Sequence, residues 1–253
     1  MRALLPIFYR EYKIRTTNLV WLFFDILVPL AYLLVFGLGF TRTVGASFSI
    51  AGRPVSYAAF FLGGVLAMAS FGIAMNTSWG WFTDRDNGIF YEMLTYPMNR
   101  GELLFGKVSF NMLLSLVQAV LTVGAGAVLL AIPVRWERFP LALVGAAVGA
   151  AGWFFLFSIF ALRIRRNDVY NTVMNIIYFV LLFASSMFYP LDPMPAWLRW
   201  TASANPISWQ VDFLRYATIG QGDSGRLWLE CALFLAFTAA AFAGANRALS
   251  AQE

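Results

Sequence analysis

The sequence predicts an all-α polytopic membrane protein. We expect six transmembrane helices, an interfacial helix before the first, and a re-entrant helical hairpin on the outer side between the fifth and the sixth. The chain of 253 residues is 60% hydrophobic with a mean hydropathy of +0.68, which is too apolar for a soluble domain of this size. Its apolar residues fall in long runs nearly free of charge, as a bilayer core of about 30 Å requires of a helix. Residues 1–253 therefore form a single transmembrane domain.

Residues 1–18 come first and have the pattern of a helix that lies on the membrane surface. One side of the helical wheel is apolar and the opposite side is basic, formed by Leu4, Leu5, Ile7, Phe8, Tyr12 and Ile14 against Arg2, Arg10 and Lys13. Glu11 and Arg15 fall inside the apolar sector, four residues apart, where oppositely charged side chains can pair. The sequence therefore predicts an ion pair between these two residues.

The six spans follow in order at residues 19–40, 57–82, 103–132, 141–162, 169–189 and 227–245. The first apolar run exceeds the h-region of a signal peptide, so we expect an uncleaved span. Lys and Arg are enriched in cytoplasmic loops of membrane proteins. With the N-terminus inside, eleven of the 18 basic residues lie on the cytoplasmic side, including the cluster Arg163, Arg165 and Arg166. Both termini are then cytoplasmic.

The segment 188–225 separates the fifth span from the sixth and does not have the pattern of a span. It contains Pro190, Pro193, Pro195 and Pro206, which prevent a continuous helix. Short helices are expected at residues 196–200 and 208–216, with interfacial anchors at Trp197, Trp200, Trp209 and Phe213. Non-helical backbone can enter a membrane where protein buries it. We therefore expect a re-entrant hairpin, and a loop lying flat on the surface is the alternative.

Residues 83–107 form a charged interlude on the cytoplasmic side. The charges are Asp84, Arg85, Asp86, Glu92, Arg100, Glu102 and Lys107. Residues 87–96 have the pattern of a short amphipathic helix, with Asp86 or Asn87 as its cap and Pro97 at its end. Such a segment is suited to contact a soluble partner. A helix that only rests on the membrane surface is the alternative.

Several functions are excluded by composition. The chain has no histidine and a single cysteine, Cys231, which excludes histidine-dependent hydrolysis, an intramolecular disulfide and Cys-cluster metal sites. Gly101–Lys107 fits G-x-x-x-x-G-K, but Val108 replaces the Mg²⁺-binding Ser or Thr, so we attribute the match to chance. Asp84 and Asp86 form a D-x-D pair, and two such carboxylates can hold a divalent cation, but no catalytic domain surrounds them. We expect no metal site and no nucleic-acid binding.

Polar and small residues inside the spans predict helix contacts. Gly145 and Gly149 form a G-x-x-x-G motif, whose partner lies either within one subunit or in a second subunit. Asp25 lies about two turns from the cytoplasmic end, where Arg15 or Arg163 can neutralise it. We favour this structural pairing over proton coupling.

The order of these parts resembles the membrane subunit of type-2 ABC exporters, the permeases of lipopolysaccharide, capsule, nodulation-factor and drug export. The resemblance covers essentially the whole chain. It rests on the basic interfacial helix, on the loop with Gly88, Glu92, Leu94, Pro97 and Arg100, and on Phe188-Tyr189-Pro190-Leu191, Asn205-Pro206 and Asp212-Phe213-Leu214-Arg215. We expect Asp212 and Arg215 to hydrogen-bond or to cap short helices.

The resemblance implies a dimer in which each subunit sits on a separate ATP-binding subunit. That partner uses ATP and Mg²⁺, whereas this chain binds no cofactor and catalyses nothing. The implied partner contacts are Arg85, Asp86, Asn87, Gly88, Glu92, Leu94, Tyr96, Pro97, Arg100, Arg165 and Arg166. The implied substrate pathway is Met68, Phe71, Met75, Trp79, Asn171, Met174, Asn175, Tyr178 and Phe179. The implied location is a bacterial-type plasma (inner) membrane, where the chain also contacts membrane lipid.

An aromatic and Met-rich pathway suits an amphiphile such as a glycolipid, a lipid-linked glycan or a drug. The alternative is that these side chains only pack the dimer seam. Two other functions stay open. An ion-coupled secondary carrier lacks support because no inverted repeat or buried acid pair is recognisable. A lipid-modifying membrane enzyme is disfavoured because the chain has no histidine.

Overall fold

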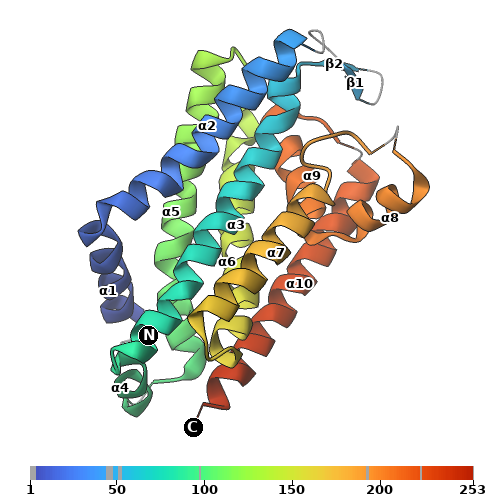
Figure 1. The fold of residues 1–253 in the computed structure, drawn as a ribbon. Helices are drawn as coiled ribbons and strands as arrows, with labels where there is room; N and C mark the ends of the chain where they lie inside the picture. Colours follow the sequence, from blue (N-terminus) through green and yellow to red (C-terminus); the bar gives the residue numbers. More distant parts are fainter. Residues whose placement is uncertain are drawn as a thin grey trace.

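The computed structural model describes residues 4–43, 48–50, 53–96, 98–191, 194–222 and 224–252. Apart from one short antiparallel pair of strands, the regular elements in these ranges are helices (Figure 1). In chain order they are α1 (Leu4–Thr17), α2 (Leu19–Thr43), β1 (Phe48–Ile50), β2 (Arg53–Val55), α3 (Tyr57–Asp86), α4 (Ile89–Thr95), α5 (Arg100–Leu129), the 3-10 turn η1 (Trp136–Arg138), α6 (Phe139–Arg163), α7 (Asn167–Phe183), α8 (Ala196–Ala204), α9 (Pro206–Ile219) and α10 (Ser224–Ser250). The predicted all-α membrane fold is confirmed.

Five helices in the described part of the chain are long and apolar enough to cross a membrane, namely α2, α3, α5, α6 and α10. The predicted fifth span corresponds to α7, which has 17 residues and is about 26 Å long. It ends at Phe183, six residues before the predicted end at residue 189. The hydroxyl of Ser185 bonds the Leu182 carbonyl at 2.6 Å and accepts the Met187 N–H at 3.2 Å. These local bonds compete with helical ones and end α7 early.

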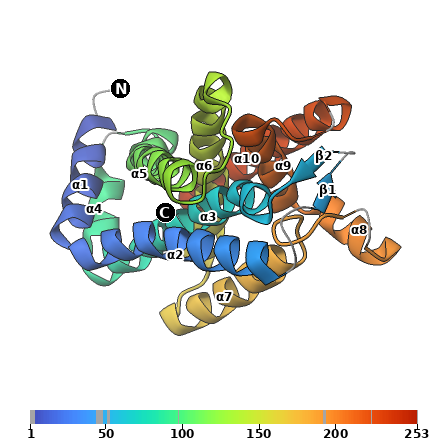
Figure 2. The same ribbon diagram turned by 90° about the horizontal axis from the view of Figure 1, so that it is seen from above.

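The central helix is α3, which α2, α5, α6 and α9 surround (Figure 2). Its side chains Phe60, Phe61, Phe71 and Trp81 are fully buried. Ser56 caps its first turn by accepting a hydrogen bond from the Ala59 N–H. Because α3 is apolar around most of its circumference, it is suited to the interior of the bundle.

The small residues of α6 allow close packing within the subunit. A Cβ atom on Gly145 would lie 2.5 Å from the Phe213 ring, and one on Gly149 would overlap the Gln210 side-chain amide. Trp153 donates to the Gln210 oxygen at 2.8 Å and joins the same two helices. The partners of the G-x-x-x-G motif are thus α9 and, further along, α10, so this contact is intrasubunit.

The two ends of the bundle carry different elements. Figure 1 shows α1, α4 and the end of α10 at one end, with α8, α9 and the strands β1 and β2 at the other. This separation agrees with the predicted topology, in which residues 83–107 and 188–225 lie on opposite sides of the membrane. The side of the membrane on which each end lies stays a prediction.

The segment 188–225 contains two short helices, α8 and α9, as predicted. They meet at Asn205, whose side chain accepts from the Ile207 N–H at 3.0 Å and donates to the carbonyls of Leu181 at 2.6 Å and Ala184 at 3.0 Å. One amide thereby caps the start of α9 and the end of α7. Pro206 occupies the first turn of α9, where its missing N–H costs nothing.

Arg215 holds the hairpin to the bundle. Its side chain is buried, bonds Asp212 at 2.8 Å, and donates to the carbonyls of Ser186 at 2.9 Å and Phe60 at 3.2 Å. The predicted contact between Asp212 and Arg215 is therefore present. Trp197 and Trp200 on α8 are exposed, and their depth in the membrane stays a prediction. Pro190 is half-buried in the irregular segment after α7, whereas Pro193 lies outside the described residues.

Candidate functional site

The candidate partner-binding helix α4 follows α3 without a long loop. The helix α3 continues through Asp86, and the N–H of Asn87 still bonds the Thr83 carbonyl at 3.1 Å. Gly88 then adopts φ 75° and forms the N-cap of α4. The predicted cap at Asp86 or Asn87 is therefore wrong, because both residues belong to the end of α3. The turn needs a left-handed residue, which glycine supplies at little cost.

The two faces of α4 differ. Phe90 and Met93 are buried against the subunit, and the Phe90 ring meets Trp81 edge-on at 5.9 Å. Tyr91, Glu92, Thr95 and Tyr96 point away and are exposed. The subunit itself thus covers the apolar face of α4, which leaves an aromatic and acidic face open.

Arg85 joins the end of α3 to the end of α6. Its guanidinium donates to the carbonyls of Ala161 at 3.0 Å and Ile164 at 3.2 Å. It also lies 5.8 Å from the centre of the Phe90 ring, so it touches α4 as well. These carbonyls are free at the end of a helix, and a cation satisfies them and the helix dipole. Arg85 is half-buried and has a structural role besides any contact with a partner.

The remaining predicted contact residues lie mostly on the surface. Asp86, Asn87, Gly88, Glu92, Tyr96, Arg165 and Arg166 are exposed, Arg85, Leu94 and Arg100 are half-buried, and Pro97 lies outside the described residues. Arg166, the N-cap of α7, bonds Asp168 in the first turn of that helix at 2.6 Å. The hydrogen bond from Arg166 holds the pKa of the Asp168 carboxyl below its usual range. Because both groups are solvated, the pair contributes little to stability.

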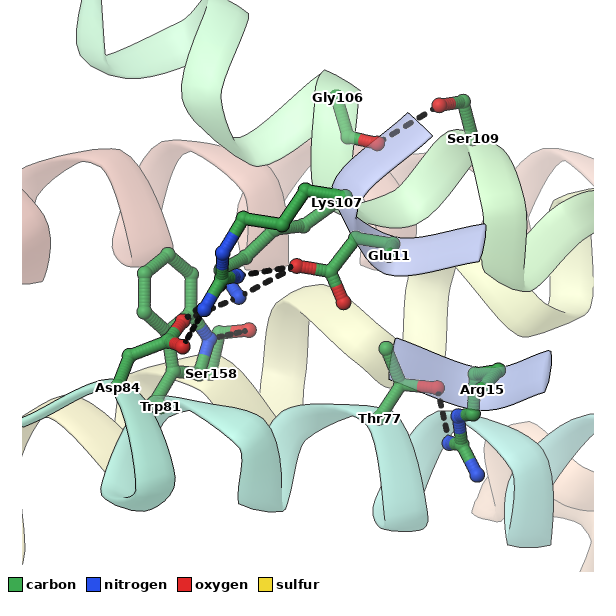
Figure 3. Close-up of polar contacts among 10 residues, drawn as sticks. Glu11, Arg15, Thr77, Trp81, Asp84, Gly106, Lys107, Ser109 and Ser158 are labelled. Carbon is green, nitrogen blue, oxygen red and sulfur yellow. Dashed lines mark hydrogen bonds and ion pairs between the residues drawn. The ribbon is translucent and has the colours of Figure 1, made fainter. Parts of the chain in front are cut away.

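A buried cluster of four charges joins α1, α3 and α5 at the same end of the molecule (Figure 3). The Lys107 ammonium lies 2.9 Å from Glu11 and 2.6 Å from Asp84, and Arg10 pairs with the same two carboxylates. The ammonium also stacks 4.6 Å over the Trp81 ring. The predicted pair of Glu11 with Arg15 is wrong, since Glu11 turns to Lys107, 96 residues away in the sequence.

A second polar group joins α1, α2 and α3. Arg15 bonds Asp25 at 3.0 Å and Thr77 at 2.8 Å, and Asn76 donates to Asp25 at 2.7 Å. The predicted neutralisation of Asp25 by Arg15 is confirmed. Arg163 is exposed at the end of α6 and is not needed for this role.

A cleft of about 580 Å³ opens beside these two groups, between α1, α2, α3 and α7. Arg10, Glu11, Arg15, Asp84 and Lys107 line its polar part. Trp21, Met75, Trp79 and Ile14 line its apolar part, and Asn18, Asn76 and Asn171 stand among them. A pocket of this size, mostly apolar with a few polar groups, is typical of small-molecule sites.

The predicted pathway residues divide into two sets. Met68, Phe71 and Met174 are buried in the subunit, where the Phe71 ring lies 4.7 Å from Trp153 and 5.1 Å from Tyr178. Met75 and Tyr178 are half-buried, whereas Trp79, Asn171, Asn175 and Phe179 are exposed. Of the nine, Met75, Trp79 and Asn171 come together at the cleft. Their role as a pathway stays a prediction.

Comparison with known proteins decides the family. The family described as ABC-2 type transporter matches residues 3–219. The chain belongs to this family. It is 28% identical over 202 residues to a protein of Cyanophora paradoxa and 28% identical over 195 residues to one of Porphyra purpurea, both named as transport permease ycf38. It is 29% identical over 209 residues to the daunorubicin resistance ABC transporter permease protein DrrB1 of Streptomyces coeruleorubidus.

The matches cover 76% of this chain in the first two cases and 79% in the third. The chain spans 65% of the length of the two ycf38 proteins and 70% of DrrB1. The predicted resemblance to type-2 ABC permeases is confirmed at the level of the family, and the chain is a multi-pass membrane protein of that family.

Sequence reasoning missed the buried charge cluster. The sequence places Asp84 and Lys107 in a charged cytoplasmic interlude, yet both are buried. One signal was present, because Glu11 falls in the apolar sector of its helix and therefore needs an internal partner. The identity of that partner was not readable, since Lys107 lies on another helix far along the chain.

Proposed function

We propose that this chain is the transmembrane subunit of an ATP-driven exporter of an amphiphile, and that a separate ATP-binding subunit drives it. The observation that carries the proposal is the arrangement of α4. Its apolar face is held by the subunit, its Tyr91, Glu92 and Tyr96 face is open, and the exposed Arg165 and Arg166 belong to the turn that Arg85 ties to α3. A short helix anchored in this way can dock into a groove of a soluble partner.

The anchoring suggests how force would pass from the partner to the membrane helices. Binding and hydrolysis of ATP and Mg²⁺ belong to the partner subunit, and this chain is the non-catalytic permease. A displacement of α4 would move α3, because Phe90 on α4 packs on Trp81 on α3. Arg85 on α3 in turn holds the end of α6. Such a change requires contacts that differ between the two states, and the partner interface supplies them. We place both termini and α4 in the cytoplasm of a bacterial-type cell, in a dimer of identical chains.

An amphiphilic cargo is favoured by the aromatic and Met-rich side chains near the cleft, and by the similarity to a permease named for daunorubicin resistance. An ion-coupled carrier is less favoured, because the buried acids of the described residues, Glu11, Asp25, Asp84 and Glu230, each pair with Arg or Lys. A carboxylate held by a permanent cation is a poor proton carrier at neutral pH.

The test is reversal of one exposed charge on α4. We expect Glu92→Arg to abolish co-purification with the co-expressed ATP-binding subunit, because like or unpaired charge at a docking surface can cost several kcal/mol. The matched control is Glu137→Arg, since Glu137 is equally an exposed glutamate but lies in η1 at the opposite end. If Glu92→Arg retains the partner and its ATP hydrolysis as Glu137→Arg does, α4 is not the docking helix.

A further inference from the structure

We infer that the cleft between α1, α2, α3 and α7 binds the neutral head group of a membrane amphiphile, with the hydroxyl or amide chemistry of a sugar, rather than an anionic head group. This inference rests on the proposed function, because it names the site and the class of the cargo. The cleft lies at the end of the molecule that carries α4, where a lipid of the adjacent leaflet would place its head group.

The first argument is charge. Three cations line the cleft, and each is already paired within the chain, Arg10 and Lys107 with Glu11 and Asp84, and Arg15 with Asp25. The bonds from Lys107 and Arg15 measure 2.6 to 3.0 Å. Three cations against three carboxylates leave no net charge. A phosphate would have to displace a buried carboxylate from its partner, which is unfavourable.

The second argument is the set of polar groups that remain open. Asn18 is exposed, and no hydrogen bond from its side chain is recorded within the described ranges. Asn76 donates its side-chain N–H to Asp25 at 2.7 Å, and Asn171 donates its side-chain N–H to Asn167 at 2.9 Å. The side-chain oxygens of both residues accept no hydrogen bond within the same ranges. The open groups are therefore uncharged donors and acceptors, which match hydroxyl and amide groups of a ligand.

The third argument is the shape and the lining of the cleft. Trp21 and Trp79 are 51% and 38% exposed, so their rings are accessible to a ligand. The Trp79 N–H bonds Asn167 at 2.7 Å, and this bond fixes the ring beside Asn171. Aromatic faces pack well on the apolar faces of sugar rings, and neighbouring Phe23 and Phe24 on α2 are exposed to an acyl chain. The volume of about 580 Å³ suffices for a head group of one or two rings.

The experiment measures lipid retained by the full chain together with its ATP-binding subunit, by native mass spectrometry after purification in nanodiscs. The probes are diglucosyl diacylglycerol and phosphatidylglycerol with the same acyl chains, and free maltose as competitor. We expect the glycolipid to be retained about tenfold better than the anionic lipid, and Asn171→Leu and Asn18→Leu each to reduce its retention about fivefold, as loss of one hydrogen bond allows. Both asparagines are exposed, so neither change should affect folding.

The matched control is Asn99→Leu, an exposed asparagine that does not line the cleft, which should retain the glycolipid like the wild type. Equal or better retention of phosphatidylglycerol, or unchanged retention in both cleft variants, overturns the inference. Competition by free maltose at the concentration of the glycolipid would overturn the requirement for an amphiphile. If the wild-type chain does not bind its ATP-binding subunit, the proposed function fails instead, and retention by the chain alone still decides the role of the cleft.

Discussion

Replacing Lys107 by methionine should destabilise the protein severely, because it leaves two carboxylates with one cation. Lys107 is 1% exposed, and its ammonium lies 2.9 Å from Glu11 and 2.6 Å from Asp84. Removing one member of a buried ion pair typically costs 3–5 kcal/mol, since the remaining charge is left uncompensated. Arg10 still contacts both acids and its side chain is 26% exposed, so we expect the lower end, about 3 kcal/mol.

The measurement is the free energy of unfolding by SDS titration in mixed micelles, for the wild type, Lys107→Met and the double variant Glu11→Gln/Lys107→Met. The double variant has one acid, Asp84, for one base, Arg10, and should recover about 1–2 kcal/mol of the loss. The control is Arg166→Met. Its bond to Asp168 is also 2.6 Å long, but the two side chains are 75% and 64% exposed. A solvated pair of this kind contributes little to stability, so Arg166→Met should leave the free energy of unfolding nearly unchanged.

Two results would refute this reasoning. If Lys107→Met lowers the free energy of unfolding no more than Arg166→Met does, burial does not govern the strength of the cluster. If the double variant is less stable than Lys107→Met alone, the loss does not come from an uncompensated carboxylate, and the packing of the lysine stem on Trp81 would explain it.

Three further predictions concern other parts of the fold. Asn205→Ala should lower the free energy of unfolding by about 2 kcal/mol, measured in the same titration, because it removes the caps of two helices; an unchanged value would contradict the capping role. Gly149→Ala should cost about 1–3 kcal/mol because its Cβ overlaps the Gln210 amide, and Gly39→Ala, which meets no atom within 4 Å, should not. In a Cys231→Ser background, an impermeant maleimide applied outside intact cells should label Thr201→Cys but not Thr95→Cys, both sites being exposed; the opposite pattern would invert the topology.

The spans could be predicted from the sequence because the length and hydrophobicity of an apolar run are enough to indicate a membrane-spanning helix. The helices α2, α3, α5, α6 and α10 all overlap their predicted ranges, as the length of a membrane core demands. The end of α7 was missed, because the hydroxyl of Ser185 and the amide of Asn205 stop the helix by hydrogen bonds that hydrophobicity does not report.

The polar contacts were predictable only where the partner is close in sequence or constrained by depth. Arg15 was found for Asp25 because both must lie near the same membrane face. The predicted pair of Glu11 with Arg15 is wrong, because the spacing of four residues describes contacts within one helix only. The actual partner, Lys107, lies on another helix. A charged residue on an apolar helix face thus indicates that a partner exists, and the fold decides which one.

The structure separates two charges that the sequence treats alike as partner contacts. If Arg85 and Glu92 both contact the partner, charge reversal of either residue should uncouple transport. Arg85 donates to the carbonyls of Ala161 and Ile164 at the end of α6, and a glutamate there would face those carbonyl oxygens and the negative end of the helix dipole. Loss of transport in Arg85→Glu would therefore follow from local unfolding as well as from a lost contact. Glu92 is exposed on α4 and its carboxylate makes no side-chain bond in the described part of the chain. Its reversal changes the surface offered to a partner and, beyond that, only the small interaction of a first-turn charge with the helix dipole. Glu92 is thus the position at which coupling can be tested apart from stability.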